Sequence, residues 1–351
     1  MKFCKKATAA VLAAALCLSA AGCSGTDKSW AVKTDSKSIP IGCYIYNLYS
    51  SYQQASVKVS DTSKSVLEQK VENKDAKTWI RGEALSSTRE LLLLDKKMSE
   101  LKLTLSDADK KRVSDANSAA WSKYSANMEK YGIAQTSFEQ SYGNAVVKEE
   151  KIFNAIYGKG GTKAVADSEL KDFYVKNSTD FSFIVCNLYT QDSSGSTTAF
   201  TDKEKKNAEE ILENYATQIK AGKLTMTKAA TAYKVLKKLS DEQLHTVKAN
   251  FTGSSSYPEA MTTALKSMKT GEVKTLELKD QQMFILMQKD DSAKNAEAEL
   301  KDEASRDSIL QSCKTEEFLT DLKKEADAMT GITVNNKALD SYDPKMFETK
   351  S

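Results

Sequence analysis

Cysteine and histidine offer this 351-residue sequence its most versatile chemistry, yet it contains only six cysteines and one histidine. No Cys-x-x-Cys pair occurs, and His245 has no second histidine with which to hold a metal ion. No nucleophile–base pair, glycine-rich phosphate loop or paired-carboxylate motif stands out either. The sequence therefore predicts no metal, no cofactor and no catalytic residue, and it places His245 in a structural role on a helix.

The cysteines fall into two groups. Three lie in an N-terminal leader or directly after it: Cys4, Cys17 and Cys23. The other three are far apart and odd in number, whereas an exported protein held by disulfides usually shows an even set. We therefore expect buried free thiols at Cys43, Cys186 and Cys313.

Residues 1–22 have the pattern of a targeting segment. Three lysines precede an apolar run of 15 residues, Ala7–Ala21, which is shorter than the roughly 20 residues of a membrane span. The run ends in Leu18-Ser-Ala-Ala-Gly-Cys23, which resembles a bacterial lipobox. The resemblance implies that Cys23 is acylated and becomes the first mature residue, anchored to the extracytoplasmic face of the cell membrane. The alternative is an ordinary signal peptide followed by a chance cysteine.

The charge balance argues against a nucleic-acid partner. The sequence holds 51 basic and 48 acidic residues, and three of the basic ones are leader lysines. The mature chain would thus carry 48 of each sign, with no strong basic field to attract a polyanion.

A central stretch, Phe181–Asp290, is expected to position the candidate site. It begins with a strand-like run and ends with two strands around a polar turn, with helices between them. Gly222 is expected to end the first helix, and Ser240-Asp-Glu-Gln243 to start the third as a capping box. The expected elements are a strand from Phe181, helices at 202–221, 225–239 and 240–250, and strands at 274–278 and 283–287.

This order resembles a parvulin-type peptidyl-prolyl isomerase domain. The resemblance rests on short runs in matching order: Gly222 with Met226, Ala229, Ala230 and Tyr233; Pro258-Glu-Ala; Met268; Gly271-Glu-Val273; and Met283-Phe-Ile-Leu286. The preceding run, Val165-Ala-Asp-Ser-Glu-Leu170, resembles the entry to that domain in PrsA-like foldases and SurA-like chaperones.

The resemblance also implies an altered pocket. The two histidines of the family would fall at Asn187 and Phe284, its Cys or Asp at Leu236, its Met or Leu at Tyr257 and its Phe at Met261. Isomerisation must lower a barrier of about 18–20 kcal/mol, and the polar ring of the family polarises the twisting amide. We therefore expect a pocket without catalysis that still binds apolar segments weakly.

The resemblance implies an α+β fold: a mostly helical chaperone module, built from N- and C-terminal segments, that carries an inserted parvulin-like α/β domain. A strand at Ile332–Val334 should pair with Trp30–Lys33, and the tail from Asp340 should be loose. The predicted divisions are a leader at 1–22, a tether at 23–29, a helical module at 30–163, a parvulin-like domain at 164–291, its completing helix and strand at 292–334, and a tail at 335–351.

Three functions remain open. The first is a lipid-anchored extracytoplasmic chaperone or foldase for unfolded exported proteins, without isomerase activity. Five methionines of the central stretch suit an adaptable binding surface, although each could simply fill the core. The second is an active prolyl isomerase, and the third is a non-catalytic lipoprotein scaffold. Clients and oligomeric state are not predicted.

Overall fold

The computed structural model describes residues 28–249 and 257–348, and it divides into two units. One unit comprises residues 28–100, 104–148 and 323–348, and the other comprises 101–103 and 149–322. Helices dominate both and the sheets are small, so the fold is α+β, as the sequence predicts. The boundaries between the two units fall near residues 148 and 322, whereas the sequence analysis placed domain ends at Lys163 and Asp291. Those two domain ends stay predictions.

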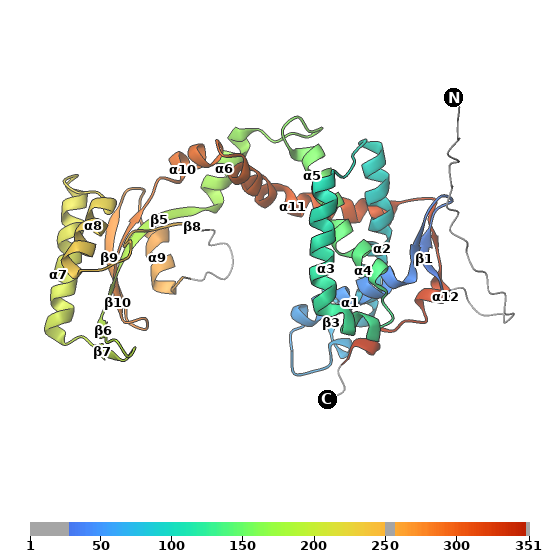
Figure 1. Ribbon diagram of the computed structural model, residues 1–351, viewed down its shortest axis with the longest axis horizontal. Coiled ribbons are helices and arrows are strands. Elements are labelled where there is room, and N and C mark those ends of the chain that lie inside the picture. The colour runs from blue at the N-terminus through green and yellow to red at the C-terminus, as the bar shows by residue number, and fades with distance from the viewer. Residues whose placement is uncertain (1–27, 250–256, 349–351) are drawn as a thin grey trace, which may run out of the picture. The chain divides into compact units, whose positions relative to one another are not determined.

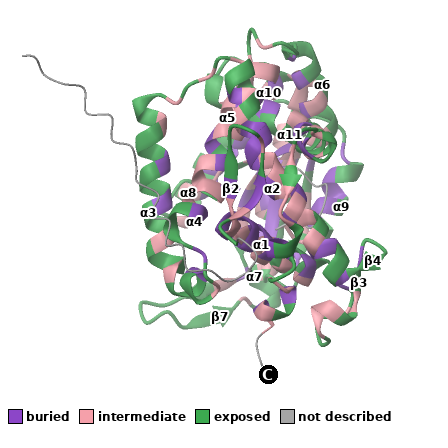
Figure 2. Ribbon diagram, turned by 90° about the vertical axis from the view of Figure 1, so that its right-hand side faces the viewer, coloured by how far each residue is buried: buried purple, intermediate pink, exposed green. Residues whose placement is uncertain are grey.

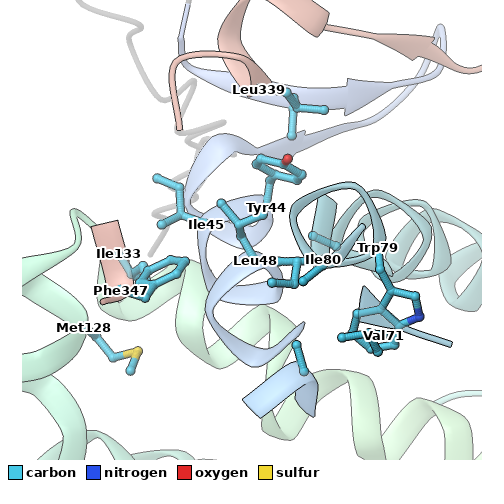
Figure 3. Close-up of a cluster of buried hydrophobic side chains, with 14 of the residues drawn as sticks. Tyr44, Ile45, Leu48, Val71, Trp79, Ile80, Met128, Ile133, Leu339 and Phe347 are labelled. Carbon is cyan, nitrogen blue, oxygen red and sulfur yellow. The ribbon is translucent and has the colours of Figure 1, made fainter. Parts of the chain in front are cut away.

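Helices α1 (Ile41–Lys58) and α2 (Ala76–Glu100) form the centre of the first unit. Each repeats apolar residues at helical spacing. Tyr44 and Leu48 of α1 pack beside Ile80 of α2 in one buried cluster, which Figure 3 shows.

A three-stranded sheet closes this unit, in the order β11 (Thr333–Val334), β1 (Trp30–Lys33) and β2 (Ser38–Pro40). Val32 lies opposite Val334 in antiparallel register, which confirms the predicted pairing of the N-terminal strand with the late one. The start and the end of the described chain therefore meet in one unit.

The next helices of the chain run from α3 to α5. Ser106 and Asp109 form a capping box at the start of α3 (Asp107–Lys130), and most of α3 is exposed in Figure 2. The structure has α4 (Gln135–Ser141) and α5 (Gly143–Tyr157), with a break at Tyr142. The Gly143 amide donates to Asn117 Oδ1 (3.1 Å) instead of continuing α4.

The C-terminal residues are ordered by packing, so the expectation of a loose tail is wrong for residues 340–348. Phe347, at the end of η2 (Pro344–Phe347), is only 4 % exposed. Its ring centroid lies 5.4 Å from that of Tyr49 and 4.8 Å from that of Tyr131. Residues 349–351 lie outside the described part. The small elements of this unit that complete the description are η1 (Val66–Glu68), β3 (Lys70–Val71), β4 (Lys74–Asp75) and α12 (Asn336–Leu339).

The second unit contains an antiparallel four-stranded sheet in the order β8, β5, β10, β9. Helices α7 and α8 cover one face, and the short helix α9 covers the other (Figure 1). Thr201 and Glu204 cap α7, and Thr225 caps α8. Gly222 follows α7 at a φ of 68°, which a glycine adopts without strain. The bounds are β5 Thr179–Asn187, α7 Asp202–Lys220, α8 Met226–Lys237, β8 His245–Ala249, α9 Glu259–Ser267, β9 Val273–Leu278 and β10 Met283–Lys289.

The helix expected at 240–250 is wrong, because the chain forms β8 there. Ser240 is followed by an irregular stretch and not by a helix. The β-branched pair Thr246 and Val247 lies opposite Ser182 and Phe181 of β5. Pairing with a long neighbouring strand has outweighed a local capping signal.

The base of this sheet is tied to two helices by a buried carboxylate. Asp180 is 1 % exposed and accepts hydrogen bonds from the Tyr174 hydroxyl and from Asn295 Nδ2, both at 2.9 Å. Tyr174 belongs to α6 (Asp167–Asn177) and Asn295 to α10 (Ser292–Glu299).

The single helical run expected after Asp290 is broken at 300–302, and α11 (Glu303–Ala328) follows. A small hairpin, β6 (Tyr189–Gln191) and β7 (Thr197–Ala199), completes the elements.

Candidate client-binding face

The two faces of the four-stranded sheet are covered by different helices. The closed face lies under α7 and α8 and includes Ile184, Cys186, Phe284 and Leu286. The α9 face carries the residues that alternate with these. From β5 and β10 they are Phe181, Phe183, Val185, Asn187, Met283, Ile285 and Met287.

The five residues predicted for the pocket do not come together. Asn187, Tyr257 and Met261 belong to the α9 face or its covering segment. Phe284 is buried on the closed face beside its strand partner Cys186. Leu236 lies on the outer surface of α8 and is 55 % exposed.

The alternation of side chains along a strand explains why the parvulin resemblance assigned Phe284 to the wrong face of the sheet. Phe284 is one residue from Met283 and one from Ile285, and successive side chains of a strand point to opposite faces. A one-residue shift would therefore put Met283 or Ile285, and not Phe284, on the face that holds Met261. Any role of the five residues in client binding stays a prediction.

Aromatic rings form a row across the α9 face. The Tyr257 and Phe181 rings meet edge to face with centroids 5.4 Å apart, and Phe181 stacks on Phe183 at 5.9 Å. Phe183 in turn stacks on the His245 ring, at 4.9 Å and an interplanar angle of 25°. The row runs from buried Phe181 to the exposed imidazole of His245. Such rings offer a flat apolar surface with a polar end.

Exposure rises along β5 as it leaves the cover of α9. Phe181 is fully buried, Phe183 and Val185 are half-buried and Asn187 is exposed. On β10, Met287 and Ile285 are buried while Met283 is half-buried. One end of the α9 face is therefore apolar and open to solvent. Phe183 and Val185 were missed as site residues, although the alternation in Phe181-Ser-Phe-Ile-Val-Cys-Asn187 marks both. Met283 is one of the five methionines of the central stretch that suit a binding surface.

Lys289 fixes the position of α9 over the sheet. Its ammonium group donates to the carbonyl oxygens of Leu265 and Met268, each at 3.0 Å. Those carbonyls lie at the C-terminal end of α9, where a cation also interacts favourably with the helix dipole. Met261 and Leu265 then pack from α9 onto Phe181 and Met287.

The closed face holds a buried polar pair in an otherwise apolar core. Burial, and then a hydrogen bond with Cys186, raise the pKa of the Tyr233 hydroxyl above its usual value. Cys43 and Cys186 are buried free thiols, as expected, while Cys313 is a half-buried one. None of this supplies a nucleophile that a large substrate could reach.

His245 lies on β8 at the margin of the α9 face, where its ring stacks on Phe183. Its placement on a strand overturns the helical position expected of it. The described residues contain no group of three or more His, Cys, Asp and Glu side chains that could hold a metal ion. What the α9 face offers is apolar contact, with Asn187 and His245 as polar groups at its margin.

Comparison with solved structures finds proteins similar in structure to this chain. Its structural neighbours are PrsA foldase proteins. The structure of foldase protein PrsA from Lactococcus lactis is 15 % identical, covers 89 % of this chain and 97 % of its own, and has a TM-score of 0.36. That from Streptococcus pneumoniae is 14 % identical over 74 % and 88 %, with a TM-score of 0.36. PrsA from Bacillus subtilis is 16 % identical over 82 % and 91 %, with a TM-score of 0.25.

No protein-family model matches the sequence, and no curated protein matches it. Within residues 28–249 and 257–348, no helix is both long enough and apolar enough to span a membrane. Cys23, predicted to carry the lipid, lies outside the described residues.

Proposed function

We propose that the protein is a lipid-anchored extracytoplasmic chaperone that binds unfolded exported chains on the α9 face without catalysing prolyl isomerisation. The observation that carries the proposal is the half-exposed apolar end of that face, with the ring of Phe183 at its centre. Neighbouring apolar side chains that stay half in water are the kind of surface that marks interaction sites. The similar solved structures are PrsA proteins, two of them named as foldases. The proposal rests on the exposure of the α9 face and not on those names.

An apolar client segment would lie along the open end of β5 and β10. Phe183, Val185 and Met283 would bury their exposed parts against it, at roughly 25 cal/mol per Å² of apolar area. Ordering the client costs a large part of that gain, so we expect micromolar or weaker affinity. Methionine and aromatic side chains accept many sequences, which suits a chaperone.

Catalysis would need polar groups on both sides of a twisting amide. The α9-face positions of β10 are Met283, Ile285 and Met287, and the aromatic row places Phe183 between Phe181 and His245. Apolar side chains therefore occupy most of this face. Asn187 and His245 are the polar side chains that an active isomerase would have to use, and they keep that alternative open. A scaffold that binds no client is the other alternative.

Titration of a permanently unfolded, fluorescently labelled protein tests the proposal. Phe183→Ala should weaken binding about tenfold, the loss expected for one apolar side chain that becomes buried on binding. Tyr215→Ala is the matched control, because this half-buried ring packs against the closed-face cluster. Equal affinity of the parent and Phe183→Ala, with both folded by circular dichroism, would contradict the proposed site.

Exchange spectroscopy by NMR on a prolyl peptide tests whether the α9 face lacks isomerase activity. We expect no acceleration of cis–trans exchange by the parent protein. Acceleration that disappears in Asn187→Ala or in His245→Ala would establish the active isomerase instead. Mass spectrometry of the detergent-extracted protein tests the anchor, with a diacylated Cys23 as the expected N-terminus.

A further inference from the structure

A second surface of the same unit has a composition that client binding does not explain. Between residues 220 and 239 the sequence contains six lysines and no aspartate or glutamate: Lys220, Lys223, Lys228, Lys234, Lys237 and Lys238. The preceding helix α7 differs, because it alternates lysines with carboxylates such as Glu204 and Glu210. Helix α8 and its flanks therefore form a local basic patch on a chain that is nearly neutral overall.

These lysines are not used within the described structure. No carboxylate in residues 28–249 or 257–348 lies within ion-pair distance of any of the six. Lys206 of α7, by contrast, pairs with Glu210 at 4.0 Å. Lys228 and Lys238 are exposed, while Lys234 and Lys237 are half-buried. Free ammonium groups on apolar stems suit an interface with water on one side.

Apolar side chains are exposed among the lysines. Val235 is 72 % exposed, Leu236 is 55 % and Leu239 is 39 %. Val235 and Leu236 line a shallow surface groove between α7 and α8 that also includes Tyr215 and Lys228. We call the six lysines with these three apolar residues the α8 surface. Lys228 and Val235 lie on the side of α8 opposite its buried residues, which pack on the sheet.

We propose that the α8 surface docks on an anionic lipid membrane. Lysines on and beside α8, together with the exposed Val235 and Leu236, have the composition of helices that lie in a membrane interface. The apolar residues would enter the boundary of the acyl chains while the ammonium groups lie among the phosphate groups. The two features call for one partner that is both apolar and densely negative.

Two other occupants fit the surface less well. In a twofold contact between copies of this chain, the six lysines would face the same six lysines, which disfavours self-association. A soluble acidic polypeptide would neutralise the lysines but offers no continuous apolar layer for Val235 and Leu236. The proposal goes beyond the proposed client site, and it can be tested without the lipid anchor.

Flotation with vesicles gives the test. The protein is the chain from residue 23 onward with Cys23→Ser, so that no acyl chain contributes. It should float with vesicles that contain one-third phosphatidylglycerol, and not with pure phosphatidylcholine. The binding should weaken at 0.5 M salt, which screens the lysines.

Two variants separate the contributions of charge and apolar contact. Lys220→Gln with Lys228→Gln and Lys238→Asn should lower partitioning about a hundredfold, since each lysine contributes about fivefold near an anionic surface. Val235→Ser with Leu236→Ser should lower it about tenfold. Because all five residues are exposed, both variants should keep the circular dichroism and melting curve of the parent.

The matched control removes the same charge from the neighbouring helix. Lys203→Gln, Lys205→Gln and Lys206→Gln in α7 should lower partitioning far less, because carboxylates lie among these lysines. Equal loss in both triple variants would overturn the proposal, as would equal flotation with neutral vesicles. Loss of binding to an acidic unfolded protein, with vesicle flotation intact, would assign the surface to polypeptides instead. Acylation of Cys23 does not enter any of these measurements.

Discussion

The closed face and the α9 face belong to the same four strands, but they are covered to different extents. Two helices with bounds Asp202–Lys220 and Met226–Lys237 bury the closed face, where Leu286 is inaccessible. A single nine-residue helix covers the α9 face and leaves Val185 half-exposed. Neighbouring residues of one strand therefore differ in role: one side provides stability, and the other provides the proposed binding surface.

This difference predicts that stability and client binding can be changed separately. A change on the closed face should lower the free energy of unfolding with a smaller effect on affinity in the protein that remains folded. A change at the open end of the α9 face should do the reverse. The following predictions test that separation, beginning with the largest effect.

Leu286→Ala should destabilise the protein by about 2–5 kcal/mol, the usual cost of emptying a fully buried leucine site. Leu286 lies between β5 and β9 in the sheet and packs in the closed-face core. Urea unfolding followed by far-ultraviolet circular dichroism measures the change. A loss below about 1 kcal/mol would show that the closed face is not the stabilising side.

Val185→Ala should cost less than about 1.5 kcal/mol, because the side chain is already half in water. The same variant should weaken binding of an unfolded client, since Val185 lies beside the Phe183 ring. Parallel unfolding and titration experiments measure both quantities. A stability loss as large as that of Leu286→Ala would remove the distinction between the faces.

Asp290→Asn should stabilise the protein slightly at neutral pH. Burial, with a smaller contribution from the charge of Asp180, raises the pKa of Asp290 above its ordinary value of 3.8. A raised pKa means that the ionised carboxylate disfavours the folded state, and this cost grows as the pH rises from 3.8 through the folded-state pKa. The asparagine can still accept the hydrogen bond from the Ser182 hydroxyl, which is 3.2 Å away in the parent.

The measurement is the melting temperature of Asp290→Asn and of the parent across pH. The variant should melt higher at pH 7, and the difference should vanish as the pH falls below 3.8. Asp192→Asn serves as a contrast, because hydrogen bonds from Ser194 and Ser196 lower the pKa of that exposed carboxyl. A gain from Asp290→Asn that persists at low pH would mean that its cause is not ionisation.

Patterns within the sequence predicted most of the second unit. The strand-like run of β5, the two helical runs of α7 and α8 and the glycine after α7 are local signals, and the structure follows them. The β8 strand was missed because Ser240-Asp-Glu-Gln243 imitates a helix start. Its true state depends on β5, which lies some sixty residues earlier in the chain.

The candidate face was harder to predict than the strands that form it. Assigning Phe284 to the pocket required the correct register to within one residue, and a family resemblance does not fix it that closely. The order of Phe347 was likewise hidden, because it depends on Tyr49 and Tyr131 from distant parts of the chain. Contacts between distant parts of the chain determine the face on which Phe284 lies and the packing of Phe347. The spacing of neighbouring residues does not predict such contacts.

The pairing of Val32 with Val334 also has a consequence for the order in which the protein can be made. The chain is synthesised from its N-terminus, so β1 and α1 emerge first, while β11 and Phe347 emerge only after the whole second unit. The second unit can therefore complete its sheet while β1 still has an unpaired edge and α1 lacks the aromatic contact from η2. Until its last segment arrives, the first unit is itself an incompletely folded chain, with exposed apolar surface of the kind that chaperones recognise.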